Sequence, residues 1–224
     1  NETFDEASDA LGFDLWSMVQ QGPEADLNQT HNTQPAMLAA GVAAWRVWEQ
    51  QSGSRPMLMA GHSLGEYTAL TCAGSLAFTD AVALVAKRGQ LMQQAVPEGT
   101  GAMAAILGLE DDRVREICAA SAGDDVVEAV NFNSPGQVVI AGNREAVQRA
   151  TEAAKEAGAK RAMPLPVSAP FHTQLMQPAG ERLDVGDELV AHVVAEVPQV
   201  VVSSAVDGYE ERRDALSPGF EERP

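Results

Sequence analysis

The sequence has few cysteines, few basic residues and no long apolar segment, and each shortage excludes a class of protein. The 224 residues include two cysteines, Cys72 and Cys118, which lie far apart in apolar surroundings. Two isolated cysteines cannot build a disulfide framework or a cysteine-rich metal cage. We therefore expect two buried free thiols and no metal site.

Basic residues are outnumbered by acidic residues, 15 against 32, which gives a formal net charge of −17. Because no segment forms a basic stripe, we exclude nucleic acid and anionic membranes as partners. An acidic surface also repels an acidic protein, so a partner of that kind would need a local basic patch. The densest candidates for such a patch are Lys155, Lys160 and Arg161.

Apolar residues make up 45% of the chain, which is enough for a sizeable core at this length. The length suits one globular domain, or one domain with a small insertion. No apolar run is long enough to span a bilayer, and the first residues do not resemble a signal peptide. We therefore expect a cytoplasmic location and no contact with membranes.

The segment around Ser63 predicts a sharp turn between a strand and a helix. An apolar run at 56–60 precedes the residues Gly-His-Ser-Leu-Gly at 61–65, and a helix-like segment follows. In a Gly-x-Ser-x-Gly turn the serine is strained and its hydroxyl exposed, while the glycines let strand and helix pass closely. The Leu64 N–H, at the start of the helix, is the expected donor to an oxyanion on an acyl group carried by Ser63. By itself this pattern does not distinguish a catalytic serine from a chance run of common residues.

The residues around this turn extend the pattern. Gly-His-Ser-Leu-Gly-Glu at 61–66 resembles the signature of malonyl-CoA:acyl carrier protein transacylases and of the acyltransferase domains of fatty-acid and polyketide synthases. The resemblance is closest to the bacterial, free-standing transacylases, and it covers residues 1 to about 183. Further family-like segments occur in the family's order at 33–36, 87–89, 97–103, 131–137 and 170–172.

The resemblance implies a two-step exchange in fatty-acid biosynthesis. Ser63 takes the malonyl group from malonyl-CoA as an ester, and the phosphopantetheine thiol of acyl carrier protein then removes it. No metal or redox cofactor is implied. His172 matches the family's catalytic base, which takes the serine proton and returns one to the leaving thiolate. A lone histidine is otherwise more often structural, and this is our expectation for His31 and His192.

Arg88 is the residue that the resemblance assigns to substrate selection. It falls in a predicted helix among apolar residues such as Leu84 and Leu91, where an unpaired guanidinium is unfavourable. A surface arginine with a snorkelling stem is the ordinary interpretation of such a position. The resemblance instead implies a bidentate pair between Arg88 and the free carboxylate of the malonyl group.

Three more residues are predicted to bind substrate. Gln34 matches a family residue near the acyl pocket, but a polar residue at the start of a helix is equally ordinary there. His62 directly precedes Ser63 within the signature. Asn131 either faces the site or supports the hairpin that follows it.

The apolar pattern predicts an α/β fold with an α/β-hydrolase-like large subdomain, which contains a parallel sheet, and an inserted ferredoxin-like small subdomain. Residues 99–168 read as β-α-β-β-α-β, with the hairpin turn at 133–136. We assign 1–98 and 169–224 to the large subdomain. The expected strands are 56–60, 102–107, 126–131, 137–141 and 161–167, with a further buried strand region within 193–206. The expected helices are 1–11, 14–19, 36–49, 66–73, 78–94, 111–120 and 144–157.

Two alternatives remain open. A serine esterase or thioesterase shares the strained serine and a later histidine, but it needs no cation at the acyl end, so Arg88 favours a dicarboxylic acyl group. The second alternative is a catalytically impaired fragment. In the family, a strand with a Gly-Gln-Gly turn precedes residue 1 and supplies an oxyanion amide, and further strands follow residue 183, where 208–224 read as a polar tail. We therefore expect the family's terminal parts to be missing.

Overall fold

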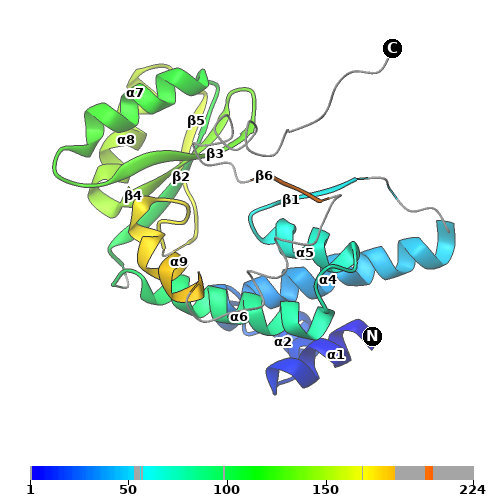
Figure 1. Ribbon diagram of the computed structural model, residues 1–224. Coiled ribbons are helices and arrows are strands. Elements are labelled where there is room, and N and C mark those ends of the chain that lie inside the picture. Colours follow the sequence, from blue (N-terminus) through cyan, green and yellow to red (C-terminus); the bar gives the residue numbers. More distant parts are fainter. Residues whose placement is uncertain are drawn as a thin grey trace, which may run out of the picture.

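The computed structural model describes residues 2–52, 56, 58–97, 99–167, 169–184 and 200–203. Figure 1 shows a four-stranded sheet with helices α7 (Asp111–Ala122) and α8 (Arg144–Glu156) packed on its outer side. The other helices lie lower in this view, and a short pair of strands, β1 (Met59–His62) and β6 (Val200–Ser203), runs above α5 (Leu64–Cys72). The mixture of helices and sheet confirms the predicted α/β class.

The helical part is built from residues 2–94. Its helices are α1 (Glu2–Leu11), α2 (Leu15–Gln21), α3 (Glu24–Leu27), α4 (Thr30–Ser52), α5 (Leu64–Cys72) and α6 (Phe78–Gln94). Helices α4 and α6 pack along each other, and α5 and α1 contact both of them. Apolar side chains at helical spacing meet between these helices, and the fully or nearly fully buried ones include Leu15, Leu38, Val42, Val82 and Val85.

Helix α4 is longer than the predicted helix at 36–49. The predicted start lies directly after Pro35, and proline is unfavourable in the interior of a helix. In the structure α4 begins at Thr30 and contains Pro35. The proline lies in the second turn, where its missing N–H removes a single helical bond near an end. As a result Gln34 is a buried residue inside the helix.

The short pair of strands carries the predicted turn. Strands β1 (Met59–His62) and β6 (Val200–Ser203) run parallel, with Met59 opposite Val200. β1 begins three residues later than the predicted strand at 56–60. It leads directly through Ser63 into α5, as the sequence predicts.

The four-stranded sheet is antiparallel throughout and has the strand order β3-β4-β2-β5. Its strands are β2 (Gly101–Leu107), β3 (Val127–Ser134), β4 (Gln137–Asn143) and β5 (Arg161–Pro164). With α7 between β2 and β3, and α8 between β4 and β5, the chain follows the predicted β-α-β-β-α-β order. A two-residue turn, Pro135 and Gly136, joins β3 to β4, and Gly136 has the positive φ of 73° that such a turn requires.

The two faces of this sheet have different neighbours. One face packs against α7 and α8 through residues such as Ile106, Val138 and Ile140. The opposite face, which we call the helix-free face, carries a smaller cluster of Met103, Val130, Val139 and Ala141, against which Leu165 and Phe171 pack. Because Phe171 is the neighbour of His172, the helix-free face is the side of the sheet that lies toward the candidate site.

Strand β5 is shorter than predicted. It ends at Pro164 rather than at residue 167. Pro164 and Pro166 have no backbone N–H, so a regular ladder of hydrogen bonds cannot continue past them. A single bond from the Leu165 N–H to the Met103 carbonyl, 2.9 Å long, still holds the chain to β2.

The chain returns to the helical part through residues 169–172. Gly101 makes this return possible, since a Cβ at that position would lie 2.3 Å from Cδ of Pro170. A 3-10 turn (Gln174–Met176) and α9 (Gln177–Asp184) then pack on α6 through Met176 and Ala179. His192 and the predicted polar tail lie outside the described residues.

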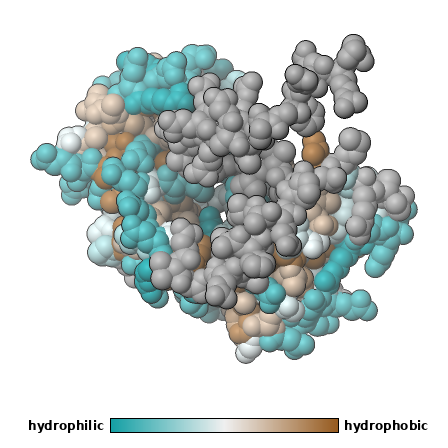
Figure 2. All heavy atoms as spheres, in the orientation of Figure 1, coloured by the Kyte–Doolittle hydropathy of each residue, from teal (hydrophilic) through white to brown (hydrophobic). Residues whose placement is uncertain are grey.

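Hydrophilic residues cover most of the outer surface of the helices in the view of Figure 2. In the part of the chain that the structure describes, no helix is long and apolar enough to cross a membrane. The same part contains no cluster of three or more His, Cys, Asp or Glu side chains suited to a metal ion.

Candidate active site

Ser63 occupies the turn between β1 and α5 with a strained backbone. Its φ is 53° and its ψ is −110°, a region that residues with a Cβ rarely adopt. Gly61 is sterically required here, because a Cβ would lie 1.9 Å from the Gly65 carbonyl carbon. A Cβ on Gly65 would meet no atom within 4 Å. The close passage of strand and helix therefore depends on the first glycine of the pattern.

The first backbone N–H groups of α5 have no acceptor within the helix, as at any helix N-terminus. The Glu66 N–H donates to the Ser63 carbonyl over 3.1 Å, whereas Leu64, the first residue of the helix, has no preceding turn to donate to. Ser63 is the N-cap residue, and its side chain makes no capping bond. The Ser63 hydroxyl and the Leu64 N–H are thus both free of the helix's own hydrogen bonding.

Arg88 joins Ser63 to Gln34. One guanidinium nitrogen, Nη1, donates to Oε1 of Gln34 over 2.6 Å, and Nη2 donates to Oγ of Ser63 over 3.2 Å. The guanidinium carbon also lies 5.6 Å from the centre of the Tyr67 ring. A partly buried arginine in an apolar helix needs polar or aromatic partners, and here they are Gln34 of α4, Ser63 at the turn and Tyr67 of α5.

Gly89 explains why Arg88 and Gln34 can meet. A Cβ at this position would lie 2.5 Å from the Cα of His31, so α6 touches the backbone of α4 there. The contact places the residue before Gly89 beside the second turn of α4. His31 is accounted for by this helix packing, and it makes no contact with the Ser63 group in the described structure.

The Gln34 amide has a defined orientation. Its nitrogen donates to the sulfur of Met92 over 3.6 Å, and its oxygen accepts from Arg88. Because a guanidinium only donates, the amide oxygen must be the atom that faces Arg88. Gln34 is 6% exposed, so the structure places it in the site group rather than at a solvent-exposed helix start.

A second group forms around His62. Its Nε2 lies 3.4 Å from Nδ2 of Asn131, which belongs to the four-stranded sheet. The ring centres of His62 and His172 are 6.3 Å apart, at an angle of 49°. Asn131 thus extends from the helix-free face and contacts His62, the residue before Ser63. Its side chain therefore does not serve its own hairpin alone.

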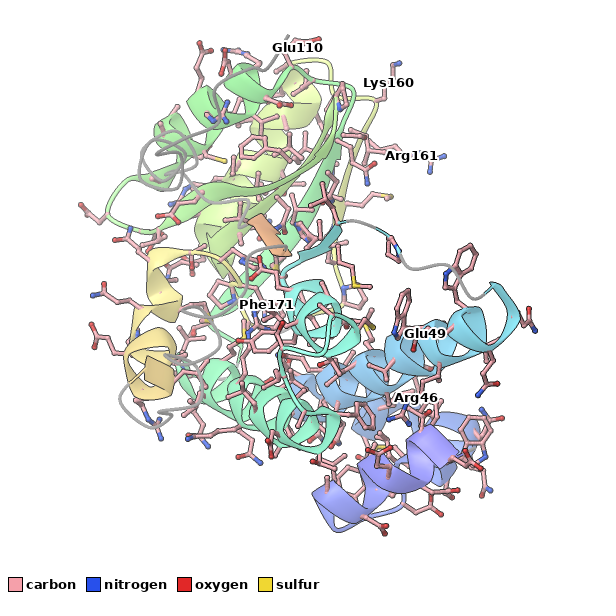
Figure 3. The ribbon with its side chains drawn as sticks, turned by 45° about the vertical axis from the view of Figure 1, so that its right-hand side comes forward. Arg46, Glu49, Glu110, Lys160, Arg161 and Phe171 are labelled. Atoms are coloured by element: carbon pink, nitrogen blue, oxygen red, sulfur yellow. The ribbon has the colours of Figure 1, made fainter. Side chains whose placement is uncertain are left out.

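His172 lies in a position that keeps it neutral. Burial, the positive charge of Arg88 and the neighbouring His62 lower the pKa of His172 from 6.5 to about 4. Its φ of 63° is unusual for a residue with a Cβ. The neighbouring Phe171, labelled in Figure 3, packs both on the helix-free face and on α6. Within the described residues no hydrogen bond joins His172 to Ser63, whose hydroxyl is held by Arg88.

Three neighbours of the site were not among the predicted site residues. Burial raises the pKa of Glu66, and the positive charge of Arg88 opposes that shift. Tyr67 faces the guanidinium, and Met92 orients Gln34. Met92 follows Arg88 by four residues, so the two share a helix face, and this spacing is a signal that could have found it.

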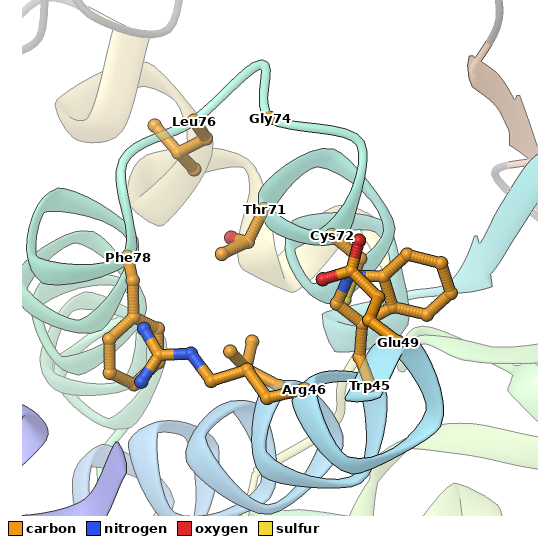
Figure 4. Close-up of a pocket in the computed structure, with 9 residues that line it drawn as sticks. Trp45, Arg46, Glu49, Thr71, Cys72, Gly74, Leu76 and Phe78 are labelled. Carbon is orange, nitrogen blue, oxygen red and sulfur yellow. The ribbon is translucent and has the colours of Figure 1, made fainter. Parts of the chain in front are cut away.

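The two cysteines are free thiols, as predicted, but only Cys118 is fully buried. Burial raises the pKa of Cys72 to about 11 and that of Cys118 to about 12. Cys72 borders a cavity of about 220 Å³ at the C-terminal end of α5, which Arg46 and Phe78 also line (Figure 4). This cavity contains none of the predicted site residues, since Ser63 lies at the other end of the helix.

The chain belongs to the acyltransferase family: the family model described as the acyl transferase domain matches residues 2–219. The malonyl CoA-acyl carrier protein transacylase of Salmonella typhimurium is 60% identical over 206 residues, which are 92% of this chain and 66% of that protein. The chain therefore spans slightly less than two thirds of the length of this relative.

Solved structures agree with this assignment. A malonyl CoA-acyl carrier protein transacylase from Coxiella burnetii is 50% identical with a TM-score of 0.82, and 96% of this chain matches 69% of that one. A malonyl-transacylase solved in complex with its type II polyketide synthase acyl-carrier protein is 61% identical with a TM-score of 0.80, and covers 82% of this chain and 60% of its own.

Proposed function

We propose that this chain carries the acyl-transfer site of a malonyl-CoA:acyl carrier protein transacylase of fatty-acid biosynthesis. The observation that carries the proposal is the 3.2 Å contact between Arg88 and the Ser63 hydroxyl. An acyl group esterified to Ser63 would extend directly beside the guanidinium. A malonyl group has a carboxylate at its far end, and a guanidinium binds carboxylates in a bidentate manner. A simple esterase has no use for a cation at this place.

In the first half-reaction the Ser63 oxygen attacks the thioester carbonyl of malonyl-CoA. His172 accepts the serine proton, the carbonyl oxygen becomes an oxyanion, and the Leu64 N–H donates to it. The C–S bond then breaks, and the CoA thiolate leaves with the proton held by His172. In the second half-reaction the carrier's phosphopantetheine thiol gives its proton to His172 and attacks the serine ester. The C–O bond of the ester then breaks, His172 returns the proton to the Ser63 oxygen, and the malonyl group leaves as the thioester of the carrier.

Gln34, His62 and Asn131 complete the proposed substrate-binding group. Gln34 holds one edge of the Arg88 guanidinium over 2.6 Å, so the other edge is presented toward Ser63. In the free protein this second edge is bonded to the Ser63 hydroxyl. A malonyl carboxylate would take over that bond and leave the hydroxyl to the base. The Asn131 contact with His62 would hold the residue before Ser63 against the four-stranded sheet.

The proposed architecture supports this division of roles. The strand order β3-β4-β2-β5 and the β-α-β-β-α-β sequence support a ferredoxin-like small subdomain at 99–168. The large α/β-hydrolase-like subdomain would comprise 1–98 and 169–224, and it contributes Ser63, Arg88 and His172. The proposal retains the cytoplasmic location expected from the sequence, and it requires neither a metal nor a redox cofactor.

The experiment that tests the function follows one malonyl group through both steps. The protein is incubated with radiolabelled malonyl-CoA, and acid-stable label on the protein is measured. Phosphopantetheinylated carrier protein is then added. A transacylase passes the label to the carrier, whereas an esterase or thioesterase releases it as free malonate. Absence of label on the protein would refute the proposal.

Replacement of Arg88 should change the acyl preference. In Arg88→Ala the malonyl carboxylate loses a charge-assisted pair worth ~1.5–3 kcal/mol, so kcat/KM for malonyl-CoA should fall about 10- to 150-fold. Acetyl-CoA has no such carboxylate, and its kcat/KM should stay constant or rise. Arg88→Lys, which keeps the charge without the planar fork, should fall between the two. Equal losses with malonyl-CoA and acetyl-CoA would show that Arg88 has a structural role instead.

The low pKa of His172 predicts the pH dependence of the reaction. At a pH between about 5 and 6.5, an ordinary histidine with a pKa of 6.5 becomes protonated, whereas a base with a pKa of about 4 stays neutral. The kcat/KM for malonyl-CoA should therefore stay level as the pH falls from 8 to about 5. Because Arg88 is one cause of the low pKa, Arg88→Met should move this acid limb to higher pH. An acid limb near pH 6.5 in the parent would contradict the placement of His172.

A further inference from the structure

The four-stranded sheet presents a rim of basic and apolar side chains along β5. This strand stands at one end of the strand order. Lys160, which directly precedes β5, and Arg161 at its start are exposed, and Met163 within the strand and Val167 beyond its end are 43% and 38% exposed. We call these four residues the β5 rim. Figure 3 shows the side chains of Lys160 and Arg161 extending outward from this edge.

The two cations of the β5 rim are uncompensated. The four arginines of α7 and α8 are each held by a carboxylate or carbonyl of this chain, namely Arg113 by Glu116, Arg115 by Asp112, Arg144 by Gly99 and Arg149 by Asp125. In the described structure the side chains of Lys160 and Arg161 make no ion pair or hydrogen bond. Lys155 of the predicted basic patch lies in α8, on the helix-covered side, and is not part of the rim.

The register of the sheet connects the β5 rim to the site. One row across the strands consists of Met163, Ala105, Val139 and Asn131. Residues directly opposite each other in an antiparallel sheet share a face, so Met163 and Asn131 both lie on the helix-free face. The row covers three strand spacings, roughly 14 Å. Its far end is the residue that contacts His62.

Arg161 lies on this same face. It is paired with Leu107, two residues along from the pair of Met163 and Ala105. The residue between them, Ala162, is buried in the core under α7 and α8, as the alternation of a strand requires. A partner bound to the β5 rim would therefore stand at the border of the face that leads to Ser63.

We propose that the β5 rim is the docking surface for the carrier protein, and that the carrier presents an acidic face with an apolar side chain within it. The inference rests on the proposed function. On a chain of net charge −17, uncompensated cations beside exposed apolar groups select an acidic partner and orient its approach. Lys160 and Arg161 pair with carboxylates of the carrier, while Met163 and Val167 cover its apolar group. The flexible thiol arm of the carrier then crosses the helix-free face to Ser63.

The test compares the two half-reactions in two charge-matched variants of the protein. In Lys160→Glu/Arg161→Glu, transfer from malonyl-Ser63 to the carrier should lose at least ~10-fold in kcat/KM, because electrostatic steering changes association rates by 10–10³. Loading of Ser63 from malonyl-CoA should remain within about two-fold, because the proposal assigns the rim to the carrier and not to CoA. Arg113→Glu/Arg115→Glu makes the same change in net charge on α7 and should leave both half-reactions unchanged.

Each other outcome is decisive. Unchanged transfer in the rim variant, or equal losses in the rim and α7 variants, would overturn the proposal. A change of oligomeric state in the rim variant without a change in transfer would assign the rim to a second copy of the chain, which also overturns it. If the rim variant loads poorly, Lys160→Gln/Arg161→Gln replaces it, with a smaller transfer loss expected. Failure of the parent to load malonyl would refute the proposed function itself, and with it the docking role.

Discussion

Ser63→Ala is expected to abolish the malonyl-enzyme and to lower transfer on the order of 10⁶-fold, as removal of a serine nucleophile does elsewhere. The oxygen of Ser63 is the atom that forms the ester, and neither Arg88 nor His172 can replace it at the turn. The measurement is label retained by the protein after incubation with radiolabelled malonyl-CoA. Label that persists in this variant would show that another residue is the nucleophile.

The backbone at Ser63 supplies a matched control. Alanine at a φ of 53° keeps the strain of the turn, whereas glycine relieves it. Ser63→Gly should therefore be as inactive as Ser63→Ala and yet more stable by about 1 kcal/mol. Thermal unfolding of the two variants measures this difference. If both are inactive but glycine alone raises the melting temperature, the loss of activity comes from the missing hydroxyl and not from unfolding.

The course of the chain was largely predictable because its elements obey local rules. Apolar periods of two and 3.6 residues located the strands and helices of residues 101–164, and Pro135-Gly136 fixed the hairpin between β3 and β4. Two of the differences in element boundaries lie near prolines. Helix α4 begins at Thr30 and runs through Pro35, whereas the predicted helix starts at residue 36, and β5 ends at Pro164 rather than at residue 167.

The members of the site were predicted from motifs, but their pairing was not. Motifs pointed to Gln34, Arg88 and Asn131 one by one, and nothing local shows that Arg88 bonds both Gln34 and Ser63. That contact depends on Gly89, which lets α6 touch α4, and on the length of α4 before Pro35. The reach of Asn131 to His62 depends on how the four-stranded sheet lies against β1. Such contacts between distant segments follow from packing, which the sequence pattern does not encode locally.

His172→Ala is expected to lower both half-reactions by ~10²–10⁴-fold, the usual contribution of a general acid and base. Burial and Arg88 keep His172 neutral, so in the parent it is ready to accept the serine proton at any pH above about 5. The variant should still form some malonyl-enzyme, but its rate should rise with pH, because hydroxide or an added buffer base must then remove the proton. His31→Ala provides a control histidine that lies outside the site.

The positive φ of His172 makes a second variant necessary, since alanine is strained at 63°. Asparagine tolerates this conformation and keeps a hydrogen-bonding side chain, but it cannot take a proton near neutral pH. His172→Asn should therefore match the parent in melting temperature and match His172→Ala in rate. If His172→Asn restores transfer to within a few-fold of the parent, His172 holds the turn in place and the proton goes elsewhere. If His172→Asn is as stable as the parent but still transfers slowly, and if its rate approaches that of the parent as the pH rises, the imidazole of His172 is the base.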